Sequence, residues 1–249
     1  MYNGQKVSVI LPTYNEKDSI KKVIGDFERL GVVDEILVIN NNAAAGTSEE
    51  VHGTSAREIL EPIQGYGQAI RRGFAEAAGD LIIVCEPDDT FLASDLMKFL
   101  VFSEEVDVVY GSRTVRNYIW EGANMGRFLK WGNWFVAKMI EFLFNTNYLS
   151  DVGCTYRLIK RPALEKIMPY LIVKSNFFGP EMMIRGYLLK LRCVQIPINY
   201  KDRVGESSVT GDLWKAFTLG MKMIFLVIAM RTGWEDFLIK HIDAKHENK

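Results

Sequence analysis

Residues 81–89 read Leu-Ile-Ile-Val-Cys-Glu-Pro-Asp-Asp, so five apolar residues run directly into an acidic turn. An apolar run of this length is typical of a strand that is buried on both faces of a parallel sheet. Glu86 and Asp88 are alternate residues that point to one side of an extended chain, where both can meet one hard cation. The alternative is an acidic turn that caps a helix beginning near Ser94. Pro87 and the preceding apolar run favour a metal site.

The sequence before this stretch alternates short β-rich runs with helical patterns. We expect strands at 7–11, 35–39, 57–60 and 81–85, and helices at 17–30 and 67–78. Strands separated by helices predict an α/β fold with a mostly parallel sheet flanked by helices. Ligands bind beyond the carboxyl ends of the strands in such sheets. The polar clusters at 12–16, 40–42 and 86–89 follow three of these strands, so they should converge in one cleft.

The second half of the chain contains two helical stretches, 127–144 and 213–230, that are rich in Phe, Leu, Ile, Met and Trp. Between them lie an expected strand at 192–197 and a polar loop at 200–211. Wide apolar faces, narrow basic stripes and tryptophans favour amphipathic helices that lie in a membrane interface. The alternative is that these faces are buried in the core or in a homo-oligomer.

The composition limits the class of protein. A chain of 249 residues with 48% hydrophobic residues can bury one sizeable core, and a net charge of -1 gives no basic field for nucleic acid. Cys85, Cys154 and Cys193 are far apart and show no metal-ligand spacing, which suits a reducing cytosol. We expect no cleavable signal, and no apolar run approaches the roughly 18 residues of a membrane span. The expected location is the cytoplasm, at the cytoplasmic face of a membrane.

Six motifs carry a resemblance to a known family. Val7-Ser-Val-Ile-Leu-Pro-Thr-Tyr-Asn-Glu16 resembles the opening strand and loop of family-two inverting glycosyltransferases, and Glu86-Pro-Asp88 occupies the place of their metal-binding Asp-x-Asp motif. Further similarity covers 65–73, 107–113, 151–157 and 203–207, and the last segment resembles the dolichyl-phosphate mannose synthase, or polyprenyl-phosphate glycosyltransferase, branch. The resemblance implies a glycosyltransferase A fold, which is Rossmann-like. We expect a catalytic domain at 1–210 and a C-terminal amphipathic helical extension at 211–249.

The same resemblance implies the roles of individual residues. The residues expected to act in catalysis are Asp88, Asp151, Glu181 and Arg203, and those expected to hold Mg²⁺ or Mn²⁺ are Asp88 and Glu86. The residues expected to bind the nucleotide sugar are Pro12, Tyr14, Glu16, Asn40, Gly67, Glu86, Arg113 and Ser207. Alternatives remain for several of them: packing for Tyr14, a surface position for Arg113, a turn for Asp151, and helix capping for Glu181.

Two positions depart from the family pattern. Asn40 stands where an Asp usually helps to hold the nucleobase or ribose, and Ser208 stands where the lipid-phosphate branch commonly has Lys. The interpretation is a transferase that moves a sugar from a UDP- or GDP-sugar to a polyprenyl phosphate with inversion. The alternatives are a saccharide or other hydroxyl acceptor, which would need a general base, and a degenerate nucleotide-sugar-binding regulator.

Overall fold

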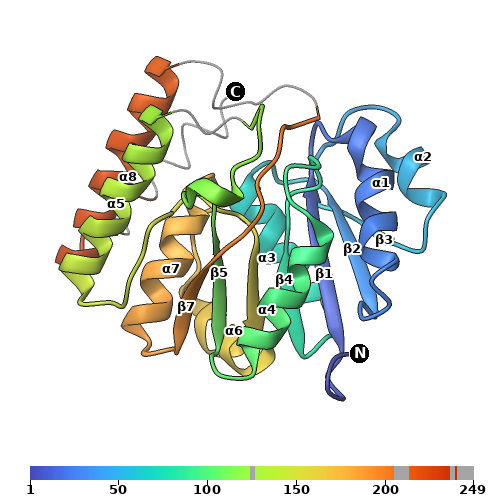
Figure 1. Ribbon diagram of the computed structural model, residues 1–249, viewed down its shortest axis with the longest axis horizontal. Coiled ribbons are helices and arrows are strands. Elements are labelled where there is room, and N and C mark those ends of the chain that lie inside the picture. Colours follow the sequence, from blue (N-terminus) through green and yellow to red (C-terminus); the bar gives the residue numbers. More distant parts are fainter. Residues whose placement is uncertain (124–126, 205–212, 236–238, 240–249) are drawn as a thin grey trace.

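The chain folds around one seven-stranded sheet with helices on both faces (Figure 1), as a computed structural model of residues 1–123, 127–204, 213–235 and 239 describes it. The strands are β1 (Val7–Thr13), β2 (Glu35–Asn40), β3 (Arg57–Leu60), β4 (Leu81–Val84), β5 (Val108–Ser112), β6 (Arg157–Lys160) and β7 (Cys193–Pro197). The helices are α1 (Lys17–Glu28), α2 (Thr47–His52), α3 (Tyr66–Glu76), α4 (Leu96–Ser103), α5 (Arg127–Phe144), α6 (Arg161–Ile167), α7 (Phe178–Leu188) and α8 (Leu213–Thr232), with short 3-10 helices η1 (Ala93–Asp95), η2 (Arg116–Tyr118) and η3 (Met168–Tyr170).

The strand order is β3-β2-β1-β4-β6-β5-β7. All neighbouring strands are parallel except β6, which lies antiparallel between β4 and β5. The prediction of a mostly parallel sheet is therefore confirmed. The carboxyl ends of β1, β2 and β4 lie at the same edge of the sheet (Figure 1), which brings the three predicted polar clusters to that edge.

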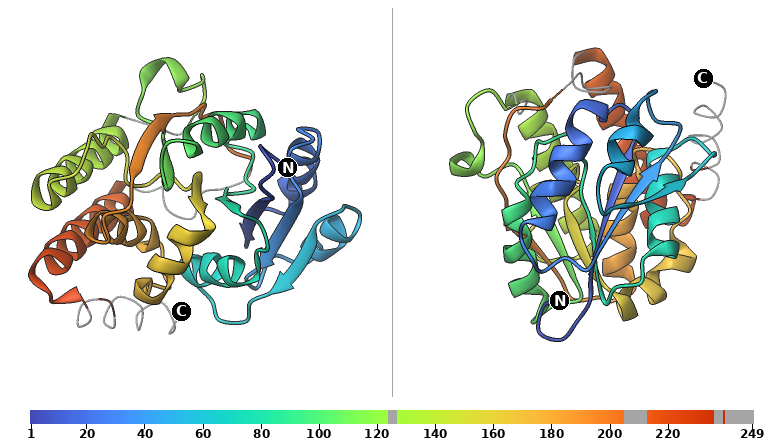
Figure 2. Two further views of the ribbon diagram at one scale, coloured as in Figure 1. Left: turned by 90° about the horizontal axis from the view of Figure 1, so that it is seen from below. Right: turned by 90° about the vertical axis from the view of Figure 1, so that its right-hand side faces the viewer.

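The apolar strands are buried because each alternate residue faces a different helical layer. Val9 of β1 belongs to a core shared with α1, α2 and α4, whereas Ile10 belongs to a core shared with α3 and α5–α8. Figure 2 shows the two layers of helices on opposite faces of the sheet. The sheet is thus a rigid base for the loops at its carboxyl edge.

Helices α5 and α8 lie side by side and, with α7, extend the second layer beyond the sheet (Figure 2). Leu226, Val227 and Met230 of α8 pack in the same core as Val136 and Ile140 of α5. The predicted C-terminal helix is therefore packed against α5 and α7. None of the described helices combines the length and hydropathy that crossing a bilayer requires.

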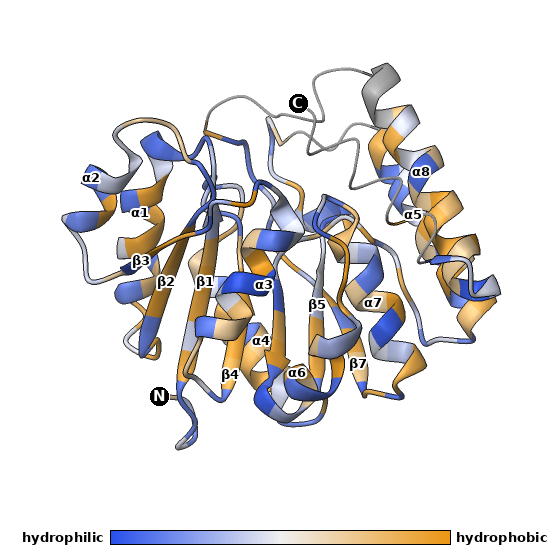
Figure 3. Ribbon diagram, turned by 180° about the vertical axis from the view of Figure 1, so that it is seen from behind, coloured by the Kyte–Doolittle hydropathy of each residue, from blue (hydrophilic) through white to orange (hydrophobic). Residues whose placement is uncertain are grey.

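Many large apolar side chains of these two helices are exposed. Those on α5 and α8 are Trp131, Trp134, Phe135, Phe142, Phe217, Met221, Phe225 and Ile228, and we call this set the aromatic helix face. Apart from the adjacent pair Trp134 and Phe135, successive members are three, four or seven residues apart within each helix, which is the spacing of one helical stripe. In Figure 3, which colours the ribbon by hydropathy, hydrophobic residues recur along both helices.

Candidate active site

Asp88 is tightly held at the carboxyl edge, because it is only 2% exposed and both of its carboxylate oxygens are engaged. Its Oδ1 atom accepts hydrogen bonds from the Thr90 amide at 3.0 Å and the Thr90 hydroxyl at 2.6 Å. Its Oδ2 atom lies 2.9 Å from Nη2 of Arg203. The two residues predicted to act in catalysis from distant parts of the chain are therefore in direct contact.

Glu16 connects the loop after β1 to the same arginine. Its Oε2 atom accepts hydrogen bonds from the amides of Tyr14 at 2.7 Å and Asn15 at 2.9 Å, and its Oε1 atom lies 3.7 Å from Nη2 of Arg203. Pro12 is buried at the end of β1, and Tyr14 is 48% exposed. The loop is thus held by its own carboxylate, which leaves the Tyr14 ring accessible to a ligand.

Glu86 is partly exposed and has no hydrogen bond or ion pair with its carboxyl group among the described residues. Burial of the carboxyl group, with the nearby Asp88 charge as the next cause, raises the pKa of Glu86 to about 7. Arg203 and Arg113 act in the opposite direction. A cation that binds beside Glu86 would lower this pKa again and stabilise the ionised carboxylate, so the site favours the binding of a cation.

Arg203 is carried by a segment that is paired with the acidic turn. The Lys201 amide donates to the Thr90 carbonyl at 3.0 Å, and the Val204 amide donates to the Asp88 carbonyl at 3.1 Å. Asp89, which has a positive φ of 63°, is held by ion pairs to Lys201 at 2.7 Å and Lys22 at 2.9 Å. These contacts fix the backbone on both sides of Arg203 relative to Asp88.

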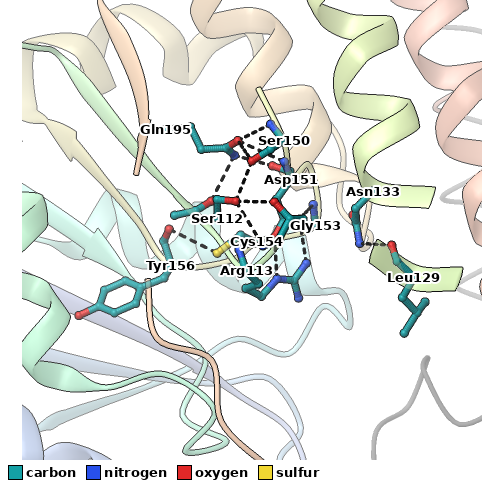
Figure 4. Close-up of polar contacts among 12 residues, drawn as sticks. Ser112, Arg113, Leu129, Asn133, Ser150, Asp151, Gly153, Cys154, Tyr156 and Gln195 are labelled. Carbon is teal, nitrogen blue, oxygen red and sulfur yellow. Dashed lines mark hydrogen bonds and ion pairs between the residues drawn. The ribbon is translucent and has the colours of Figure 1, made fainter. Parts of the chain in front are cut away.

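Arg113 and Asp151 form a two-pronged buried ion pair (Figure 4). Nε of Arg113 donates to Oδ2 of Asp151 at 2.9 Å, and Nη2 donates to Oδ1 at 3.0 Å. Burial alone raises the pKa of Asp151, but the Arg113 charge and the hydrogen bonds outweigh it and hold that pKa below its ordinary value. Burial likewise lowers the pKa of Arg113, and the Asp151 charge more than reverses this. Both groups therefore stay charged.

Gln195 of β7 positions the Asp151 loop, and the sequence analysis did not identify it. Its Oε1 atom accepts hydrogen bonds from the amides of Ser150 at 2.6 Å and Asp151 at 3.1 Å, and its Nε2 atom donates to the Asp151 carbonyl at 2.6 Å (Figure 4). The sequence signal for Gln195 is that it is the one polar side chain with an amide group in the otherwise apolar strand β7. A side-chain amide that is partly buried there must find hydrogen-bond partners within the protein.

Glu181 was implied to face the cleft, but it is fully buried in the structure. Its two oxygens accept hydrogen bonds from the amides of Ile172 and Val173, each at 3.0 Å. Burial raises the pKa of Glu181 to about 7, although these hydrogen bonds act against the rise. The carboxyl group thus anchors the loop before α7, with each oxygen bonded to a backbone amide.

Two other predicted nucleotide contacts are engaged within the protein. The Nδ2 group of the Asn40 side chain donates hydrogen bonds to Glu58 at 2.7 Å and to Ser48 at 3.2 Å. Its Oδ1 atom accepts a hydrogen bond from the backbone amide of Ala43 at 2.8 Å. Gly67 is packed so closely that a Cβ atom there would lie 2.4 Å from the Val173 carbonyl oxygen. Asn40 therefore holds the loop after β2 through its hydrogen bonds, and Gly67 allows α3 to pack closely against the Val173 backbone. Ser207 and Ser208 lie outside the described residues.

The acidic turn suits a cation that shares its coordination with a ligand. Among the described residues, no group of three or more His, Cys, Asp or Glu side chains could hold a metal ion. Asp88 nevertheless already holds a cationic group, the Arg203 guanidinium, on its Oδ2 atom. One or two carboxylates are what Mg²⁺ or Mn²⁺ needs when waters and phosphate oxygens complete its shell. Such a metal would neutralise the charge that develops on a leaving diphosphate.

Comparison with known proteins finds glycosyltransferases among the relatives of this chain. The chain is 27% identical over 209 residues to a dolichyl-phosphate hexose transferase of Haloferax volcanii, covering 84% of this chain and 88% of that protein. It is 25% identical over 215 residues to an uncharacterised glycosyltransferase of Mycobacterium bovis, covering 84% and 92% of the two chains. The fold is shared with crystal structures of glucosyl-3-phosphoglycerate synthase from Mycobacterium tuberculosis, one of which contains Mn²⁺ and uridine diphosphate. That structure matches with a TM-score of 0.70 and 17% sequence identity, and the match covers 92% of this chain and 81% of the synthase chain.

The fold is therefore the glycosyltransferase A fold, as the resemblance implied. The sequence matches the glycosyl transferase family 2 description over residues 8–168, which span β1 to β6 and include Glu16, Asp88, Arg113 and Asp151. On this match, and on the glycosyltransferases to which it is related, the chain is an enzyme of the hexosyltransferase type that belongs to glycosyl transferase family 2.

Proposed function

We propose that this enzyme transfers a hexose from a UDP- or GDP-sugar to a polyprenyl phosphate, with inversion, at the cytoplasmic face of a membrane. Asp88, with Glu86, would hold Mg²⁺ or Mn²⁺ against the diphosphate of the donor. Arg113 and Arg203 would supply planar, permanently charged donors to phosphate oxygens. The nucleotide would lie along the loop after β1, beside the exposed Tyr14 ring.

The engagement of both candidate bases supports a phosphate acceptor most directly. Asp151 uses both oxygens on Arg113, and Glu181 uses both on backbone amides. A hydroxyl acceptor needs a base to remove its proton, whereas a phosphate acceptor is already ionised and needs none. An active site whose buried acids are occupied in this way therefore suits an acceptor that brings its own negative charge.

Arg113 offers a place for that charge. Nε and Nη2 are used by Asp151, and no described residue accepts a hydrogen bond from Nη1. The guanidinium carbon lies 5.4 Å from the centre of the Tyr200 ring, and its charge also acts on Glu86. The Nη1 group thus remains to donate to an anion beside the acidic turn. The archaeal relative, whose name specifies a dolichyl-phosphate acceptor, adds support to this reading.

A saccharide or other hydroxyl acceptor is the second candidate, and one observation favours it. The Glu86 carboxyl group is partly exposed, has no partner among the described residues, and has a pKa raised to about 7 by burial and by Asp88. Those are the properties of a general base. A metal bound beside it would lower that pKa and weaken this role, which is why we prefer the phosphate acceptor.

The test is release of nucleoside diphosphate from a panel of UDP- and GDP-hexoses, with Mn²⁺ or Mg²⁺, with and without a short polyprenyl phosphate. Release that requires both the metal and the lipid phosphate is the expected result. Release stimulated only by saccharides would move the acceptor to the second candidate. Nucleotide binding without any turnover would instead identify a degenerate, regulatory protein.

The aromatic helix face supports the membrane part of the proposal. Exposed apolar areas of this extent on a soluble protein mark sites of interaction, and a lipid acceptor would reside in the bilayer. Lys222 and Arg231 are exposed on α8, where they can meet anionic headgroups.

Replacing Phe142, which is 86% exposed, by serine is expected to reduce binding to phosphatidylglycerol-containing vesicles by roughly threefold to tenfold, because one phenyl group leaves the interface. Co-sedimentation with vesicles measures this. Phe102→Ser on α4, at the opposite face of the sheet, is the matched control and should bind as the unmodified chain does. Equal binding of both variants would rule out α5 as a membrane contact.

A further inference from the structure

Among the described residues, Arg203 contacts the one carboxylate oxygen of Asp88 that Thr90 leaves available to a metal ion. Oδ1 of Asp88 accepts two hydrogen bonds from Thr90, and Oδ2 lies 2.9 Å from the Arg203 guanidinium. The Asp88 side chain is 2% exposed, so no further oxygen surface is open to a cation. In this arrangement a divalent ion can bind Asp88 only if Arg203 withdraws from Oδ2.

The carboxylates around Asp88 explain why the Arg203 guanidinium lies beside it. Glu16, Glu86 and Asp88 converge on the site, and Arg203 contacts two of them, at 3.7 Å for Glu16 and 2.9 Å for Asp88. Arg113, the other nearby guanidinium, is paired with Asp151. Without a positive charge at this position, carboxylates would face one another at a largely buried site, which is unfavourable.

We propose that Arg203 is a place-holder for the metal ion: it binds Asp88 in the nucleotide-free enzyme and moves to the diphosphate when metal and nucleotide enter together. This inference rests on the proposed metal-dependent transfer and adds its regulation. An arginine cannot lose its charge at physiological pH, so a divalent ion beside it on Asp88 would be repelled. A diphosphate supplies the anionic oxygens that accept the displaced guanidinium and also complete the metal shell.

The backbone around Arg203 is arranged for a movement of the side chain alone. The amides of Lys201 and Val204, on either side of Arg203, are bonded to carbonyls of the acidic turn, at 3.0 and 3.1 Å. Lys201 adds an ion pair to Asp89 at 2.7 Å. These contacts do not involve the Arg203 side chain, so they can persist while the guanidinium changes partner. The exchange therefore takes place within reach of Asp88.

Such an exchange makes the binding of metal and of nucleotide mutually dependent. Each ligand removes an obstacle to the other, and the coupling must be equal in both directions. We expect Mn²⁺ alone to bind weakly to the unmodified chain and more tightly when UDP or GDP is present. Removing the place-holder should reduce this difference by strengthening the binding of Mn²⁺ alone.

The experiment is a calorimetric titration of the full chain with Mn²⁺, without nucleotide and with saturating UDP or GDP, for the unmodified protein and Arg203→Gln. Arg203→Gln is expected to bind Mn²⁺ alone about tenfold more tightly, because a charge-assisted contact no longer competes. Arg192→Gln is the matched control, since it removes the same charge at the opposite end of the sheet, where Arg192 pairs with Asp107. Circular dichroism establishes that each variant is folded.

Mn²⁺ affinity of nucleotide-free Arg203→Gln that equals or falls below that of the unmodified chain would overturn the place-holder. A similar gain in Arg192→Gln would also overturn it, because the effect would then be general electrostatics. The readout needs no turnover. Failure of every sugar nucleotide to react, together with the expected Mn²⁺ result, would therefore refute the proposed function and leave the place-holder supported.

Discussion

Asp88→Asn is expected to lower kcat/KM for nucleoside diphosphate release by about 10³-fold, equivalent to roughly 4 kcal/mol of transition-state stabilisation. The amide keeps an oxygen that can accept the two hydrogen bonds from Thr90, at 3.0 and 2.6 Å, so the turn should retain its shape. It loses the negative charge on which a metal depends. Steady-state release assays over a range of Mn²⁺ concentrations measure the effect.

The control for this substitution is Glu105→Gln, which removes a negative charge from an exposed position after α4. It should leave kcat/KM unchanged. The melting temperature of Asp88→Asn is expected to move by less than about 5 °C, because Arg203 keeps contact with solvent and with Glu16. Wild-type rates in Asp88→Asn would show that Asp88 is not the metal ligand.

Asp151→Asn is expected to destabilise the fold by about 3–5 kcal/mol, since it leaves the Arg113 charge unpaired in a buried place. Oδ2 of Asp151 accepts the Arg113 amide and Nε, both at 2.9 Å, while Oδ1 accepts Nη2 at 3.0 Å and the Gly153 amide at 2.9 Å. Whichever way the new amide turns, its NH₂ group faces two donors. A melting temperature lower by roughly 10 °C is the expected reading.

A double substitution separates this pairing from a general loss of packing. Adding Arg113→Leu to Asp151→Asn removes the unpaired charge. The free energy of unfolding of the double variant should therefore fall by less than the sum of the losses in the two single variants. Glu50→Gln breaks an exposed ion pair with Lys21 and is expected to change stability by less than about 1 kcal/mol. Strict additivity in the urea-unfolding free energies would argue against a coupled Arg113–Asp151 pair.

The sequence was sufficient to predict most of the regular elements, because their patterns were long and consistent. The helix expected at 127–144 is observed as Arg127–Phe144, and the strand expected at 57–60 as Arg57–Leu60. The strand at 7–11 extends two residues further, to Thr13, since Pro12 and Thr13 continue the pairing with β2. The antiparallel β6 was not predicted, because four residues with a basic residue at each end show no strand periodicity.

The candidate site was predicted less completely than the fold. Convergence of the strand ends could be inferred from a parallel sheet, and the structure places Glu16, Asp88 and Arg203 together. The internal engagement of Asn40 and Glu181 could not be inferred, since it depends on Glu58 and on the backbone of residues 172–173, which no motif connects to them. Sequence similarity indicates that a residue has a role in the family, whereas its hydrogen-bond partners in the structure indicate what that role is.

The position of β6 has a consequence for the order in which the molecule is built during translation. Strands β1 to β4 can pair among themselves, but the apolar edge of β4 is covered only by β6, and 72 residues separate Val84 from Arg157. At the ~5–20 residues per second of protein synthesis, that edge stays open on the ribosome for about 4–15 s. An open apolar strand edge is a template for pairing with other chains, so we expect the nascent protein to be most prone to such pairing during this interval.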